Sequence, residues 1–233
     1  MFVNYNLFIS AALGILLYFA GRKARQIMGE GAGKTSAGIL FFLLCIPALS
    51  FAAYYLHLLE TPVWYYEFRS VNNIEILSAL CGLFAGFMET DKKYEKRLQR
   101  TFLRKKYLKM SLLLIFLPFV KPVLTPVALF FDLNNQWKDG VCLQSTPSTC
   151  GPCSLAITLK YYGVDASEKE VARASYTSLT GTEIWYLARY AKKKGFVVAY
   201  YEKEISVRSS CSVNHWCKNK SLRSFCRVDE TGW

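Results

Sequence analysis

Long apolar runs alternate with short basic loops through the first half of the chain. A membrane-spanning helix needs roughly 20 mostly apolar residues, so that its backbone polar groups are paired internally across the lipid core. Four runs approach this length: Phe2–Ala20, Ala37–Leu59, Ile74–Met88 and Leu108–Phe131. The third run is short, and Pro118, Pro122 and Pro126 interrupt the fourth. The pattern predicts a membrane region with about four transmembrane helices over residues 1–132.

The second half of the chain, from about residue 133, has the mixed and glycine-punctuated pattern of a water-exposed domain. A largely buried helix is expected to begin near Cys150 and to end at Gly163 in a left-handed cap. Another helix should begin near Ser167, because Glu170 lies at the capping-box spacing. We therefore expect an N-terminal transmembrane α-helical region followed by an α+β domain over residues 133–233.

The distribution of charge predicts on which side of the membrane each loop lies. The 233 residues carry a net charge of +12, and nine Lys and Arg residues lie between Lys92 and Lys109. The first loop is also basic, whereas the second has only Arg69, so the first and third loops are expected in the cytoplasm. Four spans then place the C-terminal domain outside it, in the periplasm of a Gram-negative cell. If Ile74–Met88 does not cross, this sidedness reverses. The basic residues flank apolar runs without a recognition motif, which favours a lipid bilayer over nucleic acid as partner.

The chemistry-bearing stretch surrounds Cys150. At a helix start, unpaired backbone N–H groups and the positive end of the macrodipole stabilise a thiolate. The same N–H groups can face the oxyanion that forms when sulfur attacks a peptide carbonyl. Gln144 lies six residues upstream on the entering loop, where its amide N–H can join that oxyanion hole. These positions predict a thiol nucleophile with an oxyanion-stabilising partner.

The run Gln144-Ser-Thr-Pro-Ser-Thr-Cys150-Gly-Pro resembles the Gln and Cys-Gly-Pro signature of bacteriocin-processing cysteine peptidases. The resemblance implies a papain-like α+β fold, peptide cleavage through a thioester, no metal or other cofactor, and substrates with a double-glycine leader. It makes Cys150 the nucleophile and Gln144 the oxyanion donor. Such peptidases are often fused to exporters. Because no nucleotide-binding module is evident here, an export transporter would be a separate partner chain.

A thiolate nucleophile also needs a histidine and a group that orients it. The chain has only His57, near the end of an apolar run, and His215. His215 is therefore the candidate base, with Asp229 as its orienting carboxylate. The family places its histidine before an apolar strand, whereas residues 217–227 are polar without period-two alternation and predict no strand.

A shifted reading frame is one explanation of this mismatch. If the codons of Asn219 to Arg227 are read one base later, a permitted choice spells Ile-Asn-His-Phe-Val-Ala-Phe-Ala-Glu. That run supplies the missing histidine and strand. Under this hypothesis the domain is incomplete or out of frame after about residue 207, and the product is inactive.

Three other functional interpretations remain open, apart from the possibility of disulfides. Cys150-Gly-Pro-Cys153 matches a thioredoxin-type tetrapeptide, which favours thiol–disulfide exchange. A catalytically incomplete chain would only bind leader-like peptides. Disulfides are also compatible with an extracytoplasmic domain, without a connectivity that the sequence defines. A zinc site is the remaining alternative, with ligands drawn from Cys150, Cys153, Cys211, His215, Cys217 and Cys226.

Overall fold

The computed structural model describes residues 5–28, 31–58, 62–89, 107, 109–128, 133–201 and 225–229. The chain divides into two compact units. The first comprises Met1–Glu60 and Asn73–Pro126, and the second comprises Thr61–Asn72 and Val127–Trp233. The segment 61–72, which lies between two apolar runs, thus belongs to the same unit as the C-terminal domain.

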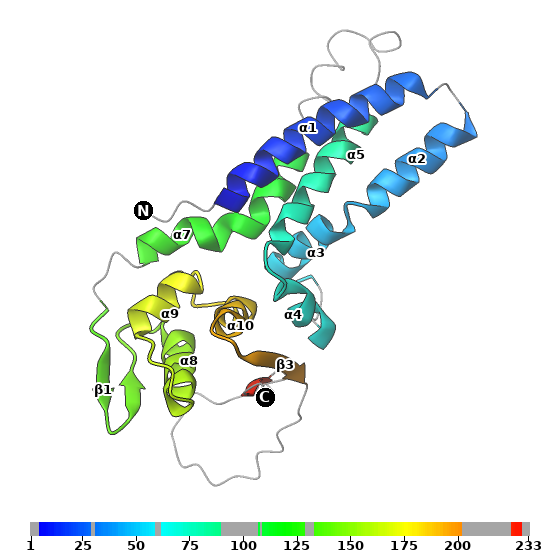
Figure 1. Ribbon diagram of the computed structural model, residues 1–233. Coiled ribbons are helices and arrows are strands. Elements are labelled where there is room, and N and C mark those ends of the chain that lie inside the picture. The colour runs from blue at the N-terminus through cyan, green and yellow to red at the C-terminus, as the bar shows by residue number, and fades with distance from the viewer. Residues whose placement is uncertain are drawn as a thin grey trace. The chain divides into compact units, whose positions relative to one another are not determined.

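The first unit is helical, and α1, α2 and α5 lie side by side in it (Figure 1). Its elements are α1 (Tyr5–Ile27), α2 (Ala32–Leu43), α3 (Ile46–Tyr55), η1 (Ile74–Ala79), α5 (Leu80–Met88), η2 (Leu117–Phe119) and α7 (Val120–Ala128), the last of which crosses the boundary between the units.

Glycines bring the backbones of α1 and α5 together. A Cβ atom on Gly82 would collide with the carbonyl oxygen of Gly14, and one on Gly86 would collide with the carbonyl oxygen of Tyr18. From the other side, a Cβ on Gly21 would collide with the carbonyl oxygen of Leu83. Small residues that allow such close approach are typical of helix pairs packed in membranes, where van der Waals contact replaces the hydrophobic effect.

One helix of the described residues is long and apolar enough to cross a membrane by itself. This is α1, a helix of 23 residues that contains an 18-residue window with a mean hydropathy of 1.4. The run Ala37–Leu59 forms α2 and α3, which are bent by 44° relative to each other. Pro47 lies in the first turn of α3 and lacks the N–H that would continue the helical hydrogen bonding, which explains the break. By length and composition alone, the described residues offer up to three spans if each bent helix pair is counted as one.

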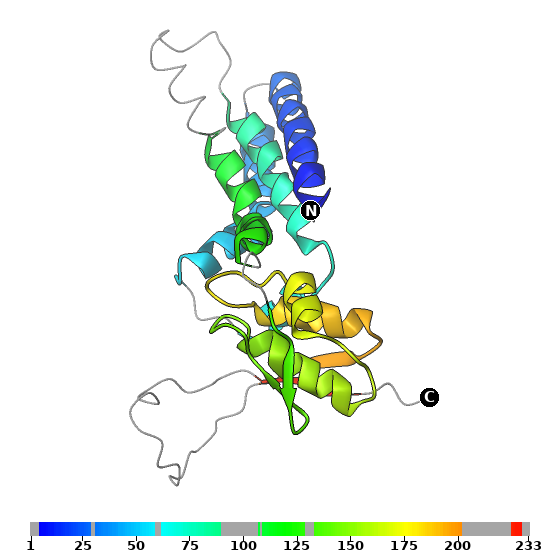
Figure 2. The same ribbon diagram turned by 90° about the vertical axis from the view of Figure 1, so that its left-hand side faces the viewer.

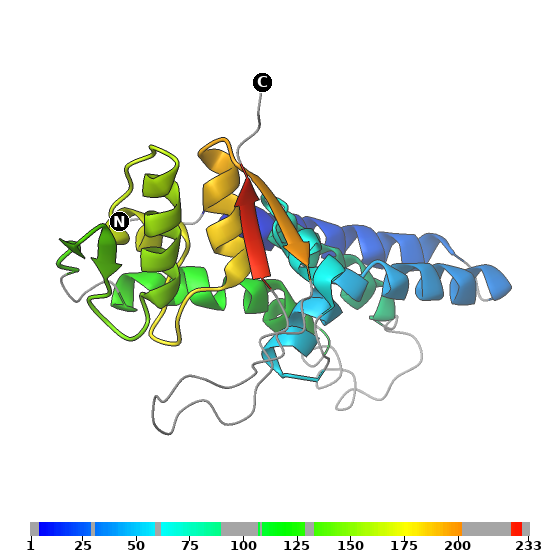
Figure 3. The same cartoon turned by 90° about the horizontal axis from the view of Figure 1, so that it is seen from below.

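The second unit combines helices with short strands, in agreement with the expected mixed content. Antiparallel strands β1 and β2 form a hairpin that lies along α8 (Figure 2). Strands β3 and β4 form a second antiparallel pair beside α10 (Figure 3). The elements of the second unit are α4 (Val63–Arg69), β1 (Gln136–Lys138), β2 (Val141–Leu143), α8 (Cys150–Tyr161), α9 (Glu168–Ala174), α10 (Ile184–Lys193), β3 (Val197–Tyr201) and β4 (Phe225–Asp229).

The caps of α8 and α9 follow the sequence prediction. Gly163 has a φ of 78°, and the N–H of Val164 returns to the carbonyl oxygen of Leu159 at 2.9 Å. Ser167 caps α9 by accepting from the N–H of Glu170 at 3.1 Å. The Glu170 carboxylate, however, does not complete the capping box and instead accepts from the hydroxyl of Tyr190 at 2.6 Å. These caps fix the ends of the helices that build the core.

Aromatic side chains join α4 to the rest of the second unit. The ring of Tyr66 stacks on Tyr200 of β3 with centroids 5.9 Å apart, and the guanidinium of Arg69 lies 4.5 Å from the ring of Trp185. The backbone oxygen of Arg69 accepts from Nε of Arg189 at 3.1 Å. Because Arg69 and Trp185 are both fully buried, α4 is part of the core of this unit.

Strand β4 corrects one expectation. Residues 217–227 predict no strand, yet Phe225–Asp229 pairs with β3 in the register Val197↔Asp229 to Tyr201↔Phe225. The pairing partner is the apolar run Val197–Tyr201. A ladder of backbone hydrogen bonds can therefore form without apolar alternation in the second strand, because tertiary context overrides local pattern.

Candidate active site

Cys150 is the first residue of α8, directly after the N-cap residue Thr149, as the sequence predicts. Its side chain is exposed. The first helical hydrogen bond runs from the N–H of Cys153 to the carbonyl oxygen of Thr149 at 3.0 Å. The N–H groups of Cys150 and Gly151 precede this bond, in the first turn, where amides face away from the helix. An accessible sulfur therefore lies beside backbone donors that suit a developing oxyanion.

A threonine turn fixes the entry into this helix. Thr149 is buried, and its hydroxyl donates to the carbonyl oxygen of Thr146 at 2.8 Å while accepting from the Thr146 N–H at 3.2 Å. The neighbouring hydroxyl of Ser148 donates to the carbonyl oxygen of Leu179 at 2.7 Å. These bonds hold the loop that delivers Cys150 to the surface.

Gln144 is exposed and directly follows β2. The next residue, Ser145, is bound by the carboxylate of Glu168. Its N–H donates to Oε1 at 2.8 Å, and its hydroxyl donates to Oε2 at 2.6 Å. The backbone of Gln144 is thus held on one side by the strand and on the other by a buried acid. Sequence reasoning missed Glu168, because nothing in the local pattern links α9 to this loop.

Glu168 is completely buried, as the first residue of α9. Burial raises the pKa of its carboxyl, but the hydrogen bonds that the carboxylate accepts, above all from Ser145, outweigh this, and the net pKa is lowered. Its own backbone N–H donates to the side-chain oxygen of Asn135 at 2.9 Å. Glu168 therefore acts as an ionised clamp on the loop between β2 and α8.

Cys142 and Cys153 are both buried, and their sulfur atoms lie 2.8 Å apart. With Glu168 they form a group whose potential metal-ligating atoms all lie within 4.8 Å of one another. Burial is the largest cause that raises the pKa of each thiol. Cys142 was not singled out from the sequence, although its place in a strand with exposed neighbours, Val141 and Leu143, marks it as inward-facing.

The remaining candidates are not brought to Cys150 by the described residues. His215 lies outside them, as do Cys211 and Cys217 of the zinc hypothesis. Asp229 is the last residue of β4, and its backbone pairs with Val197, but its side chain is not described. The structure therefore places Cys150 and Gln144, whereas the roles of His215 and Asp229 stay predictions.

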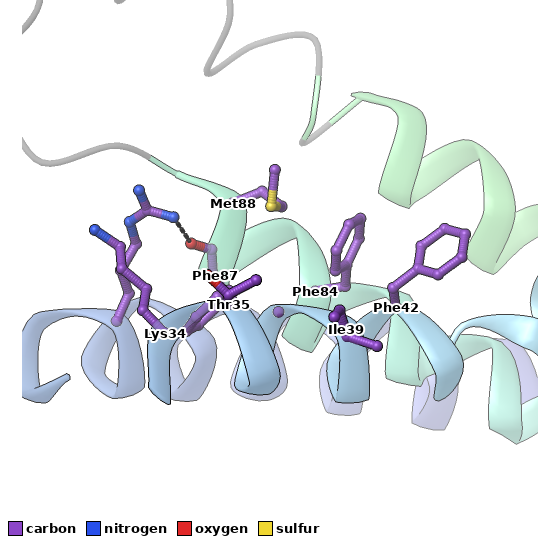
Figure 4. A pocket seen from close by; sticks show the side chains of 9 residues that line it. Lys34, Thr35, Ile39, Phe42, Phe84, Phe87 and Met88 are labelled. Carbon is purple, nitrogen blue, oxygen red and sulfur yellow. Dashed lines mark hydrogen bonds between the residues drawn. The ribbon is translucent and has the colours of Figure 1, made fainter. Parts of the chain in front are cut away.

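A hollow of about 410 Å³ opens in the first unit (Figure 4). The aromatic rings of Phe42, Phe84 and Phe87 form the apolar part of its lining. At its edge, Nη1 of Arg25 donates a hydrogen bond to the carbonyl oxygen of Phe87 at 2.9 Å. The residues that line it come from α1, α2 and α5 and include none of the candidate catalytic residues. This hollow is therefore separate from the chemistry at Cys150.

Comparison with known families agrees with the arrangement at α8. The second unit contains a segment that is similar to a cysteine peptidase domain. Residues 138–218 match the Peptidase C39 family. The match confirms the resemblance to bacteriocin-processing cysteine peptidases. It contains Gln144, Cys150 and His215 and ends before Asp229.

The chain is also similar to an uncharacterized protein of Methanothermobacter marburgensis. The two are 36% identical over 77 residues, which cover 33% of this chain and 54% of that protein. The chain thus spans about half the length of this curated relative. Comparison with solved structures gave no match.

Proposed function

We propose that this chain is a membrane-anchored cysteine peptidase that cuts a peptide bond after a double-glycine leader. The observation that carries the proposal is the exposed Cys150 at the N-terminus of α8, within the segment that matches the peptidase family. The substrate class follows from the family resemblance. The fold of the domain is proposed to be papain-like.

In the proposed reaction, the Cys150 sulfur attacks the carbonyl carbon of the scissile bond. The N–H of Cys150 and the amide of Gln144 stabilise the resulting oxyanion. The amine leaves with a proton supplied by His215, which Asp229 orients, and a thioester remains on Cys150. Water then hydrolyses the thioester, and its proton returns through the same histidine.

Sidedness is supported by the packing of α4. This helix lies between the second and third apolar runs, yet it forms part of the core of the peptidase unit. The segment 61–72 and the peptidase domain must therefore lie on the same side of a membrane. With basic first and third loops in the cytoplasm, that side is extracytoplasmic, which is the periplasm if the membrane is a bacterial inner membrane. A separate export transporter remains part of the proposal.

Contacts of Cys153 weigh against the thioredoxin-type alternative. In that mechanism the second cysteine of Cys-x-x-Cys attacks a mixed disulfide on the first. Here the sulfur of Cys153 lies 2.8 Å from that of Cys142, so Cys142 competes with Cys150 as its partner. Peptide hydrolysis is the better-supported use of Cys150.

The test is a cleavage assay with the full chain in detergent and a synthetic peptide that carries a double-glycine leader. We expect cleavage after the second glycine, its loss in Cys150→Ala and His215→Ala, and a decrease of about 10²–10³ in kcat in Gln144→Ala. Lys160→Ala, on the exposed part of α8, serves as the matched control and should cleave normally. Persistent cleavage by Cys150→Ala would refute the central proposal.

Binding of the peptide without cleavage by the wild-type chain would favour the catalytically incomplete, peptide-binding alternative. In that case the gene should be read from the codon of Glu202 onward. A one-base shift that restores His-Phe-Val would assign the missing activity to the reading frame. An unshifted frame would leave peptide binding as the function.

A further inference from the structure

Two buried thiols face each other between β2 and the first turn of α8. The sulfur atoms of Cys142 and Cys153 lie 2.8 Å apart, and the residues are 5% and 4% exposed. A disulfide has an S–S distance of about 2.05 Å, so the pair needs to close by only roughly 0.8 Å. We propose that Cys142 and Cys153 form a disulfide that joins β2 to α8, on either side of Gln144 and Cys150.

A metal ion fits this pair less well. Two thiolates on a tetrahedral zinc ion, with Zn–S bonds of about 2.3 Å, lie about 3.8 Å apart, well beyond the observed 2.8 Å. Glu168, the third member of the group, already accepts from the N–H and the hydroxyl of Ser145. Among the described residues the group also has three members, one fewer than a closed zinc site needs. The geometry favours a bond between the sulfur atoms.

The reaction is a two-electron oxidation. Each thiol loses one hydrogen, and a disulfide of a small thiol or of an oxidoreductase accepts both and becomes two thiols. Extracytoplasmic compartments maintain such oxidants. Both thiols are buried, and burial raises their pKa, so an oxidant reaches them more readily in the folding chain than in the finished domain. The bond is therefore a permanent staple.

The staple also protects the nucleophile. Cys150 and Cys153 have the spacing that forms a disulfide in thioredoxin-type proteins, and such a bond would remove the attacking sulfur. When Cys153 is bonded to Cys142, Cys150 keeps a free thiol in an oxidising compartment. Protection of the nucleophile rests on the proposed role of Cys150. Formation of the disulfide between Cys142 and Cys153 does not depend on that role.

Two-step thiol labelling tests the staple. Membranes that contain the full chain are treated with N-ethylmaleimide under denaturing conditions, then reduced and treated with iodoacetamide. Trypsin releases residues 139–160 as one peptide that holds all three cysteines, and fragment spectra locate each label. We expect maleimide on Cys150 and the iodoacetamide label on Cys142 and Cys153. Maleimide on all three, or a protected pair of Cys150 and Cys153, would overturn the proposal.

Two variants separate the staple from the peptidase activity. Cys150→Ala should retain the protected pair while losing cleavage, so each proposal can fail alone. In Cys142→Ala, the freed Cys153 should bond to Cys150, and both should shift to the iodoacetamide label. A maleimide label on Cys150 in this variant would refute the protective consequence.

Discussion

At the scale of single residues, Glu168 decides how the loop before the nucleophile is held. Its lowered pKa means that the folded state favours the ionised form more than the unfolded state, for which the pKa is about 4.3. This contribution to stability is fully present above that value and is lost as the pH falls through the lower, folded-state pKa. The domain should therefore lose stability as the pH falls below about 4.3.

We expect Glu168→Gln to destabilise the second unit by about 1–3 kcal/mol at neutral pH, because two charge-assisted hydrogen bonds to Ser145 are weakened. The variant should also show less loss of stability between about pH 5 and pH 3 than the wild type. Thermal unfolding of the full chain across this range measures both effects. Asp165→Asn, at an exposed carboxylate, is the control. An unchanged pH dependence in Glu168→Gln would show that another group causes the acid sensitivity.

The predictable part of the site was the part encoded by local sequence. The position of Cys150 follows from the cap at Gly163 and from the apolar spacing of one helix, and Gln144 follows from the family signature. Glu168 and the pair of Cys142 with Cys153 depend on contacts between elements. A single sequence does not define which buried side chains meet, so these residues emerged only from the structure.

At the scale of elements, the contact of α1 with α5 depends on glycine. Gly82→Ala should destabilise the first unit by about 1–3 kcal/mol, because its Cβ would collide with the backbone oxygen of Gly14, which cannot shift without moving the helix. Gly33→Ala in α2 has no atom within 4 Å of the added Cβ, so it should be neutral or slightly stabilising. Thermal unfolding of both variants in detergent measures the difference. Equal stability would show that α1 and α5 do not pack through these glycines.

Apolar periodicity predicted where helices form better than it predicted where a helix bends or which unit a helix belongs to. It gave the first run as one helix, and α1 extends that run to Ile27 through a basic end. It did not give the bend between α2 and α3, although Pro47 carried the signal. It also did not assign α4 to the peptidase unit, because the burial of Arg69 against Trp185 is a contact between residues far apart in the sequence.

At the scale of the whole molecule, the position of α4 in the second unit restricts how many times the chain can cross a membrane between α4 and the C-terminal domain. If the first unit spans a bilayer as proposed, residues 61–72 and the rest of the peptidase unit lie on one side of it, and the chain between residues 72 and 133 crosses it an even number of times. Two apolar runs lie in this interval, so both cross or neither does. The shorter one, Ile74–Met88, has six residues of 3₁₀-helix and nine of α-helix. At about 2.0 Å and 1.5 Å per residue these span about 25 Å, close to the roughly 30 Å hydrocarbon core.

Cysteine labelling in intact cells tests this topology, in a background in which Cys150, Cys211, Cys217 and Cys226 are replaced by alanine. We expect a membrane-impermeant maleimide to label Asn72→Cys and Asp165→Cys from outside, because both positions are exposed and lie in the second unit, which is proposed to be extracytoplasmic. Gly31→Cys, in the basic first loop, should be labelled only after the cells are lysed. Opposite accessibility of Asn72→Cys and Asp165→Cys would contradict the packing of α4 in the peptidase unit. Labelling of Gly31→Cys alone from outside would keep that packing and place the peptidase in the cytoplasm, where substrate would meet it before export.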